Sequence, residues 1–364
     1  MGWIGSNDFL APAYSVQGRG VPPQARPHAM APDSLLAQGT LVLEVQITSG
    51  ETGDQPLIRI DRTDGWVRCL HLVYEPNGNL VLRIDQAGQK TRAHVALSPR
   101  SRDTRLRITY VWDSPARHGW LTVEDLDQAL LAQSEFDNPP PLLHRDLADL
   151  CRDTARQYFA ASAEMFALSD RPEPVALMPG FGAETKVTTD IGPRAVENLR
   201  RGDLVRTACG TLAPIRWITC SDVPAAGALA PVHLRAPYFG LDQDIRVAQD
   251  HMMMISGSDA EYLFGEAEVM VQARHLLGSK GARLVAGRGV MRYYHLLLDT
   301  HECIQLGGAW GESLFVGAMA GTPDLIATTP LAAMSPSALP RHRKLTRPLL
   351  REYETVSLLS AMIA

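Results

Sequence analysis

The stretch MPGFGAETKVTTDIGPRAVENLRRGDLVRTACGTLAPIRWI, residues 178–218, decides the fold expected for the second half of the chain. Its β-branched run TKVTT indicates a strand, and DIGP (190–193) indicates a turn. The turn RGD (201–203) then leads into a second strand, LVRT. The tip ACG (208–210) predicts a hairpin whose returning strand is APIRWI. On their own, these elements predict compact β-structure.

Four further blocks follow downstream: VHLRAPYFG (232–240), IRVAQDHMMMISG (245–257), VMVQARHLLG (269–278) and YYHLLLDTHECIQLGGAWGESLFVG (293–317). With the opening stretch, these blocks in this order resemble a bacterial Hedgehog/intein (Hint) domain. The resemblance implies an all-β horseshoe over residues 178–335. A helical tail over residues 336–364, containing RPLLREYETVSLL, resembles the C-terminal extension of bacterial members.

The first motif of the family is changed at its first residue. Bacterial Hint domains of this type usually begin with Cys-Phe-x-x-Gly-Thr, and the similar run here is GFGAET. Phe181 and Thr185 match that pattern, whereas Gly180 stands at the nucleophile position. The resemblance implies that a thiol or hydroxyl at this position attacks the preceding carbonyl. Gly180 offers neither, so we expect the Pro179–Gly180 bond to stay intact.

The second motif, Thr/Ser-x-x-His, is changed as well. The matching run is AQDH, in which Ala248 replaces the hydroxyl residue and His251 is kept. The resemblance implies that this histidine protonates the departing amide nitrogen, and that His301 belongs to a late block. Two losses in one expected site predict a degenerate, non-enzymatic binding or structural protein. His251 and His301 are then vestigial residues of the catalytic site.

The alternative is an autoprocessing Hint protein that cleaves near Gly180 with a relocated nucleophile. The retained histidines favour it. Cys303 and Cys209 are the thiols considered for that role. Either would have to approach the reacting carbonyl to about 3–3.5 Å with a lowered pKa. The run CIQL instead favours Cys303 as a packed apolar residue.

The first half of the chain has a different pattern, of short runs with period two separated by turns. These runs are LVLEVQI (41–47), PLIRI (56–60), LHLVYE (70–75), LVLRID (80–85), HVALS (94–98), RLRITYVW (105–112) and GWLTVED (119–125). They predict an antiparallel β-sandwich over residues 38–170. A Pro- and Gly-rich arm (1–37) precedes it, and a linker (171–177) containing RPEPV follows.

The strand rhythm of this first domain resembles that of concanavalin- or laminin-G-like jelly rolls. The resemblance implies an unknown protein or carbohydrate ligand, and it leaves open a lectin or glycan-active module. Asp61, Asp64 and Glu75 offer carboxylates for a calcium site, but their positions are more typical of solvated turn and face residues.

Composition excludes several classes of function. The net charge of −5 argues against a general nucleic-acid surface and against a polybasic membrane patch. No apolar run is long enough to span a bilayer and no Sec signal opens the chain, so we expect a protein that is cytoplasmic or exported by a non-Sec route. Five cysteines without a CxxC pair predict neither a disulfide framework nor a structural zinc site.

No cofactor or metal is expected from the sequence. The histidines considered as ligands are His233, His251, His295 and His301. On a straight strand, His295 and His301 would share a face but lie about 20 Å apart, at about 3.3 Å per residue. That spacing argues against one ion shared by this pair.

Overall fold

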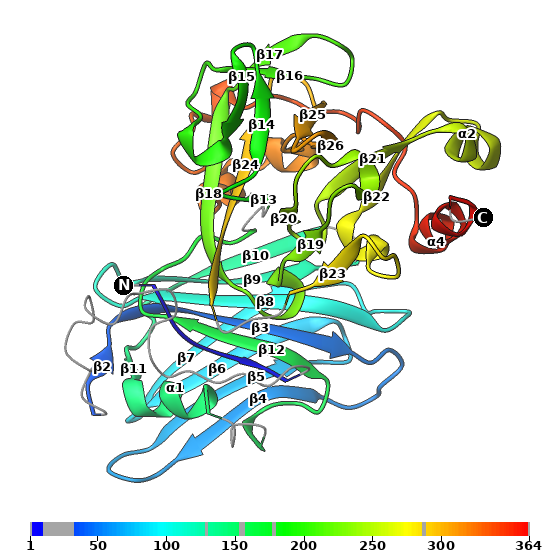
Figure 1. The fold of residues 1–364 in the computed structure, drawn as a ribbon. Helices are drawn as coiled ribbons and strands as arrows, with labels where there is room; N and C mark the ends of the chain where they lie inside the picture. Colours follow the sequence, from blue (N-terminus) through cyan, green and yellow to red (C-terminus); the bar gives the residue numbers. More distant parts are fainter. Residues whose placement is uncertain are drawn as a thin grey trace. The chain divides into compact units, whose positions relative to one another are not determined.

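The computed structural model describes residues 2–9, 33–127, 130–152, 157–176, 180–285 and 289–362. The chain divides into two compact units (Figure 1). Unit 1 is Met1–Ala176 with Ala226–Ala228 and Gly287–Val290, and unit 2 is Leu177–Ala225, Leu229–Ala286 and Met291–Ala364. Among the described helices, none has the length and apolar composition needed to cross a membrane.

Unit 1 is the antiparallel β-sandwich predicted from the alternating runs. Its six-stranded sheet has the order β1 (Trp3–Asp8), β12 (Ala163–Ser169), β3 (Gln38–Ile47), β8 (Thr104–Asp113), β9 (His118–Asp125), β10 (Leu130–Asp137). Its four-stranded sheet has the order β4 (Gln55–Arg62), β5 (Arg68–Tyr74), β6 (Asn79–Gln86), β7 (Gln89–Ala96). A short pair, β2 (Leu35–Leu36) and β11 (Leu142–Leu143), and helix α1 (His144–Leu150) complete the described elements.

The period-two pattern explains why these strands pack as two layers. In β8, Leu106, Ile108 and Tyr110 alternate along the strand and join the core. The same core contains Leu72 and Leu82 from the four-stranded sheet. Successive side chains of a strand point to opposite faces, so one apolar face per sheet is buried between the layers.

The sequence did not predict β1 and β10, the two edge strands of the six-stranded sheet. Residues 3–8, assigned to a loosely ordered arm, form β1 and pair with β12, while residues 10–32 of that arm lie outside the described part of the chain. β10 pairs with β9 along its length, although its sequence LLAQSEFD does not alternate clearly. Each lies at an edge of the sheet, where β1 pairs with the distant β12 and β10 pairs with β9 just before it, and this pairing is not visible in the strand's own pattern.

The segment predicted as a linker is fixed to the sandwich at its beginning. The Thr40 hydroxyl donates to the Arg171 carbonyl at 2.9 Å and accepts the Glu173 N–H at 2.7 Å. The Glu173 carboxylate in turn accepts from the Ser169 hydroxyl at 2.8 Å. These contacts hold residues 171–173 against β3 and the end of β12.

Unit 2 is the all-β horseshoe expected from the resemblance, and it consists of two sheets. The first has the order β18 (Trp217–Pro224), β24 (Val290–Leu297), β13 (Phe181–Gly182), β20 (Ile245–Val247), β19 (Val232–Leu234), β23 (Ala282–Leu284). The second has the order β17 (Leu212–Pro214), β16 (Leu204–Arg206), β14 (Lys186–Thr189), β25 (Cys303–Leu306), β26 (Ala309–Glu312), β21 (Met252–Ser256), β22 (Glu268–Gln272), with β15 (Gly192–Ala195) paired to β14.

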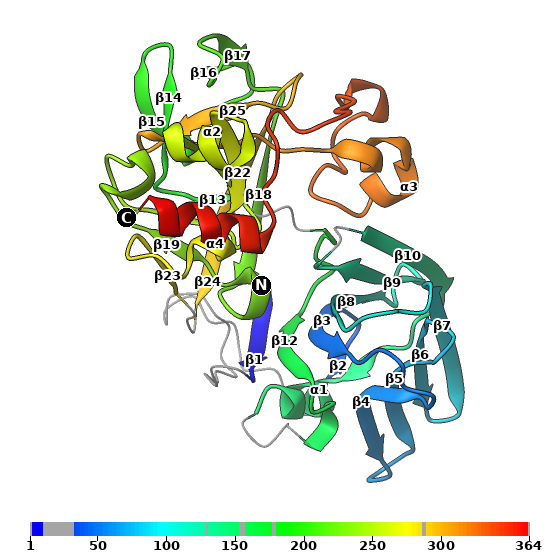
Figure 2. The same ribbon diagram turned by 90° about the vertical axis from the view of Figure 1, so that its right-hand side faces the viewer.

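Short helices lie at the outside of this unit: α2 (Ser258–Phe264), α3 (Pro323–Ile326) and α4 (Glu352–Ala361). The C-terminal helix is present as expected and lies beside α2 (Figure 2). Its buried face is formed by Thr355 and Leu358, whereas Tyr353 and Val356 are exposed. The apolar residues of the tail sequence therefore do not all belong to the buried face of the helix.

Candidate active site at Gly180

Gly180 directly precedes the short central strand β13. Its neighbour Phe181 is fully buried and pairs with Val247 of β20 on one side and with Tyr294 of β24 on the other. The Gly180 carbonyl accepts a hydrogen bond from the Ala248 N–H at 2.8 Å. Gly180 and Ala248, which replace the nucleophile and the hydroxyl residue of the Hint motifs, are therefore adjacent. Pro179, on the other side of the expected scissile bond, lies outside the described residues.

The space at Gly180 is closed by β24. A Cβ atom built on Gly180 would lie 2.3 Å from the carbonyl oxygen of Tyr294 and 2.9 Å from Cγ of His295. Non-bonded carbon atoms normally keep about 3.5–4 Å from their neighbours. The first obstacle is a main-chain atom within a sheet, which no side-chain rotation can remove. In this conformation, residue 180 has no side chain and no room for one.

His251 is buried between β20 and β21. It is 1% exposed, and its ring lies edge-on to Phe181 and to His295, with centroid separations of 5.6 Å and 5.3 Å. Among the described residues, neither ring nitrogen has a hydrogen-bond partner. Burial, followed by the nearby His295 and His301, lowers its pKa well below the ordinary histidine value. His251 is therefore a neutral imidazole near pH 7.

Glu312 is a site residue that the sequence analysis did not select. It is 5% exposed at the end of β26. Its Oε1 accepts the Met252 N–H at 2.9 Å and lies 3.6 Å from Nδ1 of His251. Its Oε2 lies 3.5 Å from Nε2 of His301. Burial raises the pKa of this carboxyl group. Its two oxygens lie between the two retained histidines, His251 and His301.

His301 is held by the C-terminal segment of unit 2. The Thr346 N–H donates to its Nδ1 at 3.1 Å, so a proton on the neutral ring sits on Nε2, facing Glu312. A neighbouring histidine, His342, has a similar arrangement. Its Nδ1 accepts the Val316 N–H at 3.2 Å, and its Nε2 lies 3.2 Å from the Leu298 carbonyl. Burial lowers the pKa of His342.

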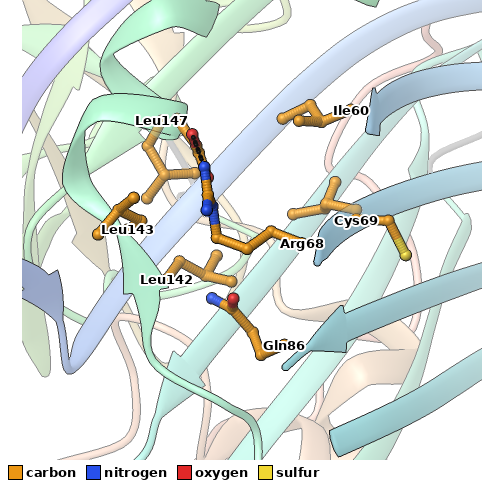
Figure 3. A pocket seen from close by; sticks show the side chains of 9 residues that line it. Ile60, Arg68, Cys69, Gln86, Leu142, Leu143 and Leu147 are labelled. Carbon is orange, nitrogen blue, oxygen red and sulfur yellow. Dashed lines mark hydrogen bonds and ion pairs between the residues drawn. The ribbon is translucent and has the colours of Figure 1, made fainter. Parts of the chain in front are cut away.

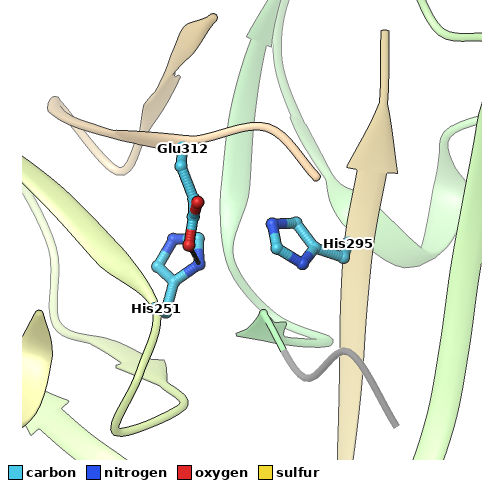
Figure 4. Close-up of side chains that lie close together, drawn as sticks. All are labelled: His251, His295 and Glu312. Carbon is cyan, nitrogen blue, oxygen red and sulfur yellow. Dashed lines mark ion pairs between the residues drawn. The ribbon is translucent and has the colours of Figure 1, made fainter. Parts of the chain in front are cut away.

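The expectation that His295 and His301 lie far apart assumed a straight strand. β24 ends at Leu297, and the chain turns before β25 begins at Cys303. One nitrogen of His295, one of His251 and one oxygen of Glu312 all lie within 4.8 Å of one another (Figure 4). In the described part of the chain this is the one such group of three metal-ligating side chains. The turn after β24 therefore allows His295 and His301 to approach the same carboxylate.

The two thiols considered as relocated nucleophiles have opposite environments. Cys303 is 1% exposed, in an apolar cluster with Met254 and Met270, and burial raises its pKa to about 12. Cys209 is exposed at the hairpin tip between β16 and β17. A hydrogen bond with the Thr207 hydroxyl lowers its pKa. Cys303 is protonated and packed, and Cys209 belongs to a different sheet from β13.

The carboxylates of unit 1 considered for calcium are engaged with cations. Asp61 lies 2.8 Å from Nε of Arg59 and 2.7 Å from Nε2 of His71. Asp64 pairs with Arg68 and Arg145, and Glu75 pairs with Arg83. These contacts favour the interpretation of the three carboxylates as structural partners of basic side chains.

Two hollows among the described residues of unit 1 differ greatly in size. One surrounds the buried Arg68, whose Nε lies 2.6 Å from Asp146, and its volume of ≈ 20 Å³ suits a single water molecule (Figure 3). The other has a volume of ≈ 300 Å³ beside β4 and β5. Its lining residues are Asp54, Pro56, Ile58, Arg59, His71 and Val73. Only the second is large enough for a small organic ligand.

Comparisons with known proteins bear mainly on unit 2. Residues 179–318 match the family model of the Hint domain. No curated protein matches the chain. Two solved structures are similar at 14% identity, covering 37% of this chain and 99% of theirs: the bacterial intein-like domain from Clostridium thermocellum (TM-score 0.28) and the MchDnaB-1 intein (TM-score 0.26).

A third similar structure is the Ruminococcus gnavus IT-sialidase CBM40, at 16% identity and a TM-score of 0.24. That likeness covers 36% of this chain, which spans 64% of the length of the CBM40 chain. The motif order, the two β-sheets and the family match agree for the second half of the chain. Residues 179–318 are therefore a Hint domain.

Proposed function

We propose that this chain is a two-domain binding or structural protein whose Hint domain does not cleave the peptide bond before residue 180. The observation that carries the proposal is the closed position at Gly180. The Tyr294 carbonyl would stand 2.3 Å from any Cβ there. A thiol or hydroxyl is thus absent, and a side chain able to present one does not fit.

The remaining groups do not supply the chemistry in its place. Attack on a peptide carbonyl requires a nucleophile, and departure of the amine requires a proton donor. Ala248 contributes a methyl group where the motif has a hydroxyl. His251 is held neutral by burial, so it is a poor acid at neutral pH. The retained histidine by itself therefore does not make the domain active.

A relocated thiol is the main competing explanation. Cys303 would have to ionise, but burial raises its pKa to about 12. At pH 7 that leaves roughly one molecule in 100,000 as thiolate, since each pH unit below the pKa is a tenfold loss. Cys209 ionises more readily but lies at an exposed hairpin tip. Neither thiol combines reactivity with a place beside β13.

The mass of the purified full-length chain tests this proposal. We expect one species at 39.8 kDa after prolonged incubation with a thiol or with hydroxylamine, because no ester or thioester forms. Release of a fragment that begins at Gly180 would overturn the proposal. The variants C303S and C209S, measured in parallel, would then identify the thiol responsible.

A second candidate function concerns unit 1, where the larger hollow favours a small polar ligand such as a carbohydrate. It combines the apolar side chains of Ile58 and Val73 with the polar groups of Arg59 and His71. That mixture of apolar surface and few polar groups is typical of ligand sites.

A glycan array with the full-length protein tests this second candidate. Binding that is lost in R59A but kept in R83A, which alters an exposed arginine outside the hollow, supports it. An array without signal, or equal binding by both variants, argues against a carbohydrate ligand at this hollow.

A further inference from the structure

We propose that His251, His295 and Glu312 form a binding site for a divalent transition metal, with zinc as the best match. The three side chains come from separate elements: the turn before β21, the middle of β24 and the end of β26. All three are buried, at 1%, 4% and 5% exposure. In Figure 4 the carboxylate of Glu312 lies beside the imidazole of His251, and the imidazole of His295 points toward both.

The separations suit a small ion after a modest adjustment. The three candidate ligand atoms lie within 4.8 Å of one another. Zinc–ligand bonds of about 2.0–2.1 Å place tetrahedral ligands roughly 3.3 Å apart. Side-chain movements of about 1 Å would therefore bring the group to coordination distance. The ring of His251 and the carboxylate of Glu312, already 3.6 Å apart, need the least movement.

The polar groups of His251 provide the second line of argument. In the described part of the chain, neither Nδ1 nor Nε2 of this buried ring has a hydrogen-bond partner. Buried polar atoms nearly always have one, since an unsatisfied group loses the hydrogen bonds it made to water. A metal ion bound to one ring nitrogen would restore a strong interaction to this side chain.

The donor set indicates which metal. Two imidazoles and one carboxylate are typical of zinc sites that leave a fourth position open. Calcium and magnesium prefer all-oxygen ligands, so the histidines argue against them. His301 would orient the carboxylate from outside the site, because its Nε2 lies 3.5 Å from Oε2 of Glu312. A bound ion would also join the two sheets of unit 2, since β24 belongs to one and β26 to the other.

This site occupies the position that the missing nucleophile would need. The same His295 that would coordinate the metal lies 2.9 Å from a Cβ built on Gly180. The metal site does not depend on the loss of cleavage, however. Metal binding is measured on the intact chain, whereas cleavage is read from mass, so the two proposals fail separately.

Titration of the full-length protein with Co²⁺ and Zn²⁺, after removal of metal by a chelator, tests the proposal. We expect one Co²⁺ per chain with the intense visible absorption of a four-coordinate ion, displaced by Zn²⁺. We also expect X-ray absorption of the zinc form to show imidazole scattering. The variant H295Q should weaken zinc binding by more than about 100-fold, because even outer-shell changes cost about 10–100-fold.

The matched control is H233Q, which changes a histidine paired with Asp244 outside the site, and it should bind zinc as the parent does. Absence of stoichiometric binding by the parent protein overturns the proposal, and so does unchanged binding by H295Q. If H295Q does not fold, the X-ray absorption of the parent decides, and a zinc site without imidazole ligands is the contrary result.

Discussion

The substitution Gly180→Ala tests the closed position with the smallest possible side chain. The added methyl would stand 2.3 Å from the Tyr294 carbonyl oxygen and 2.9 Å from Cγ of His295. The expected cost is steric, because the added methyl overlaps a main-chain atom of β24. Relieving an overlap of about 1 Å means moving β13 from β24 around the fully buried Phe181. Overpacking of this kind costs about 1–3 kcal/mol.

The matched control is Gly278→Ala, at a glycine in unit 2 with no heavy atom within 4 Å of a built Cβ and no positive φ. Urea unfolding of the full chain, followed by amide exchange in unit 2, separates this unit from unit 1. We expect G180A to lose about 1–3 kcal/mol and G278A to stay within about 0.5 kcal/mol. Equal stability of the two variants would refute the argument that β24 closes the position.

Three other expectations follow from buried groups. Burial lowers the pKa of His342, so below about pH 6.5 the unfolded state binds more protons than the folded state. The stability of unit 2 should therefore fall as the pH drops through that value. Urea unfolding midpoints of the parent protein should show this loss, and those of H342Q should show a smaller one. Cys209 should be the thiol that reacts fastest with a disulfide reagent in the native protein, so C209S should lose the fastest labelling phase. Cys303 should react only after unfolding, and rapid labelling of Cys303 would contradict its burial. Glu44→Ala should cost about 1–3 kcal/mol in thermal or urea unfolding, because it removes the carboxylate that lies 2.8 Å from the buried Arg107, while Glu124 stays 3.5 Å from the same guanidinium; a cost below about 0.5 kcal/mol contradicts this.

The sequence predicted the strands whose burial follows from their own alternation. In β8 the apolar residues at every second position are sufficient to place one face in the core. β1 and β10 have no comparable signal, because their stability comes from pairing with β12 and β9. Local pattern therefore identified the centre of the sandwich and missed both edges of its larger sheet.

The site shows the same limit at the level of side chains. The motifs that contain Gly180, Ala248 and His251 fix positions on neighbouring strands, and the structure brings those positions together. Glu312 and His295 come together through the turn between β24 and β25 and through the pairing of β26 with β25 and β21. The separation expected for His295 and His301 assumed one straight strand, and the sequence does not reveal the turn that interrupts it. The sequence feature that could have pointed to Glu312 is its place directly before Ser313 in the block of residues 293–317.

The state of the bond before residue 180 can be followed in the tryptic peptide that spans it. Trypsin should release a peptide spanning residues 157–186, because it cuts after Arg156 and Lys186, no other lysine lies between them, and Arg171 precedes a proline. Its abundance relative to a peptide from another part of the chain can be quantified by mass spectrometry after expression and after incubation with hydroxylamine. If residue 180 cannot start cleavage, the ratio stays unchanged in every sample. Loss of this peptide together with a new peptide that starts at Gly180 would contradict it.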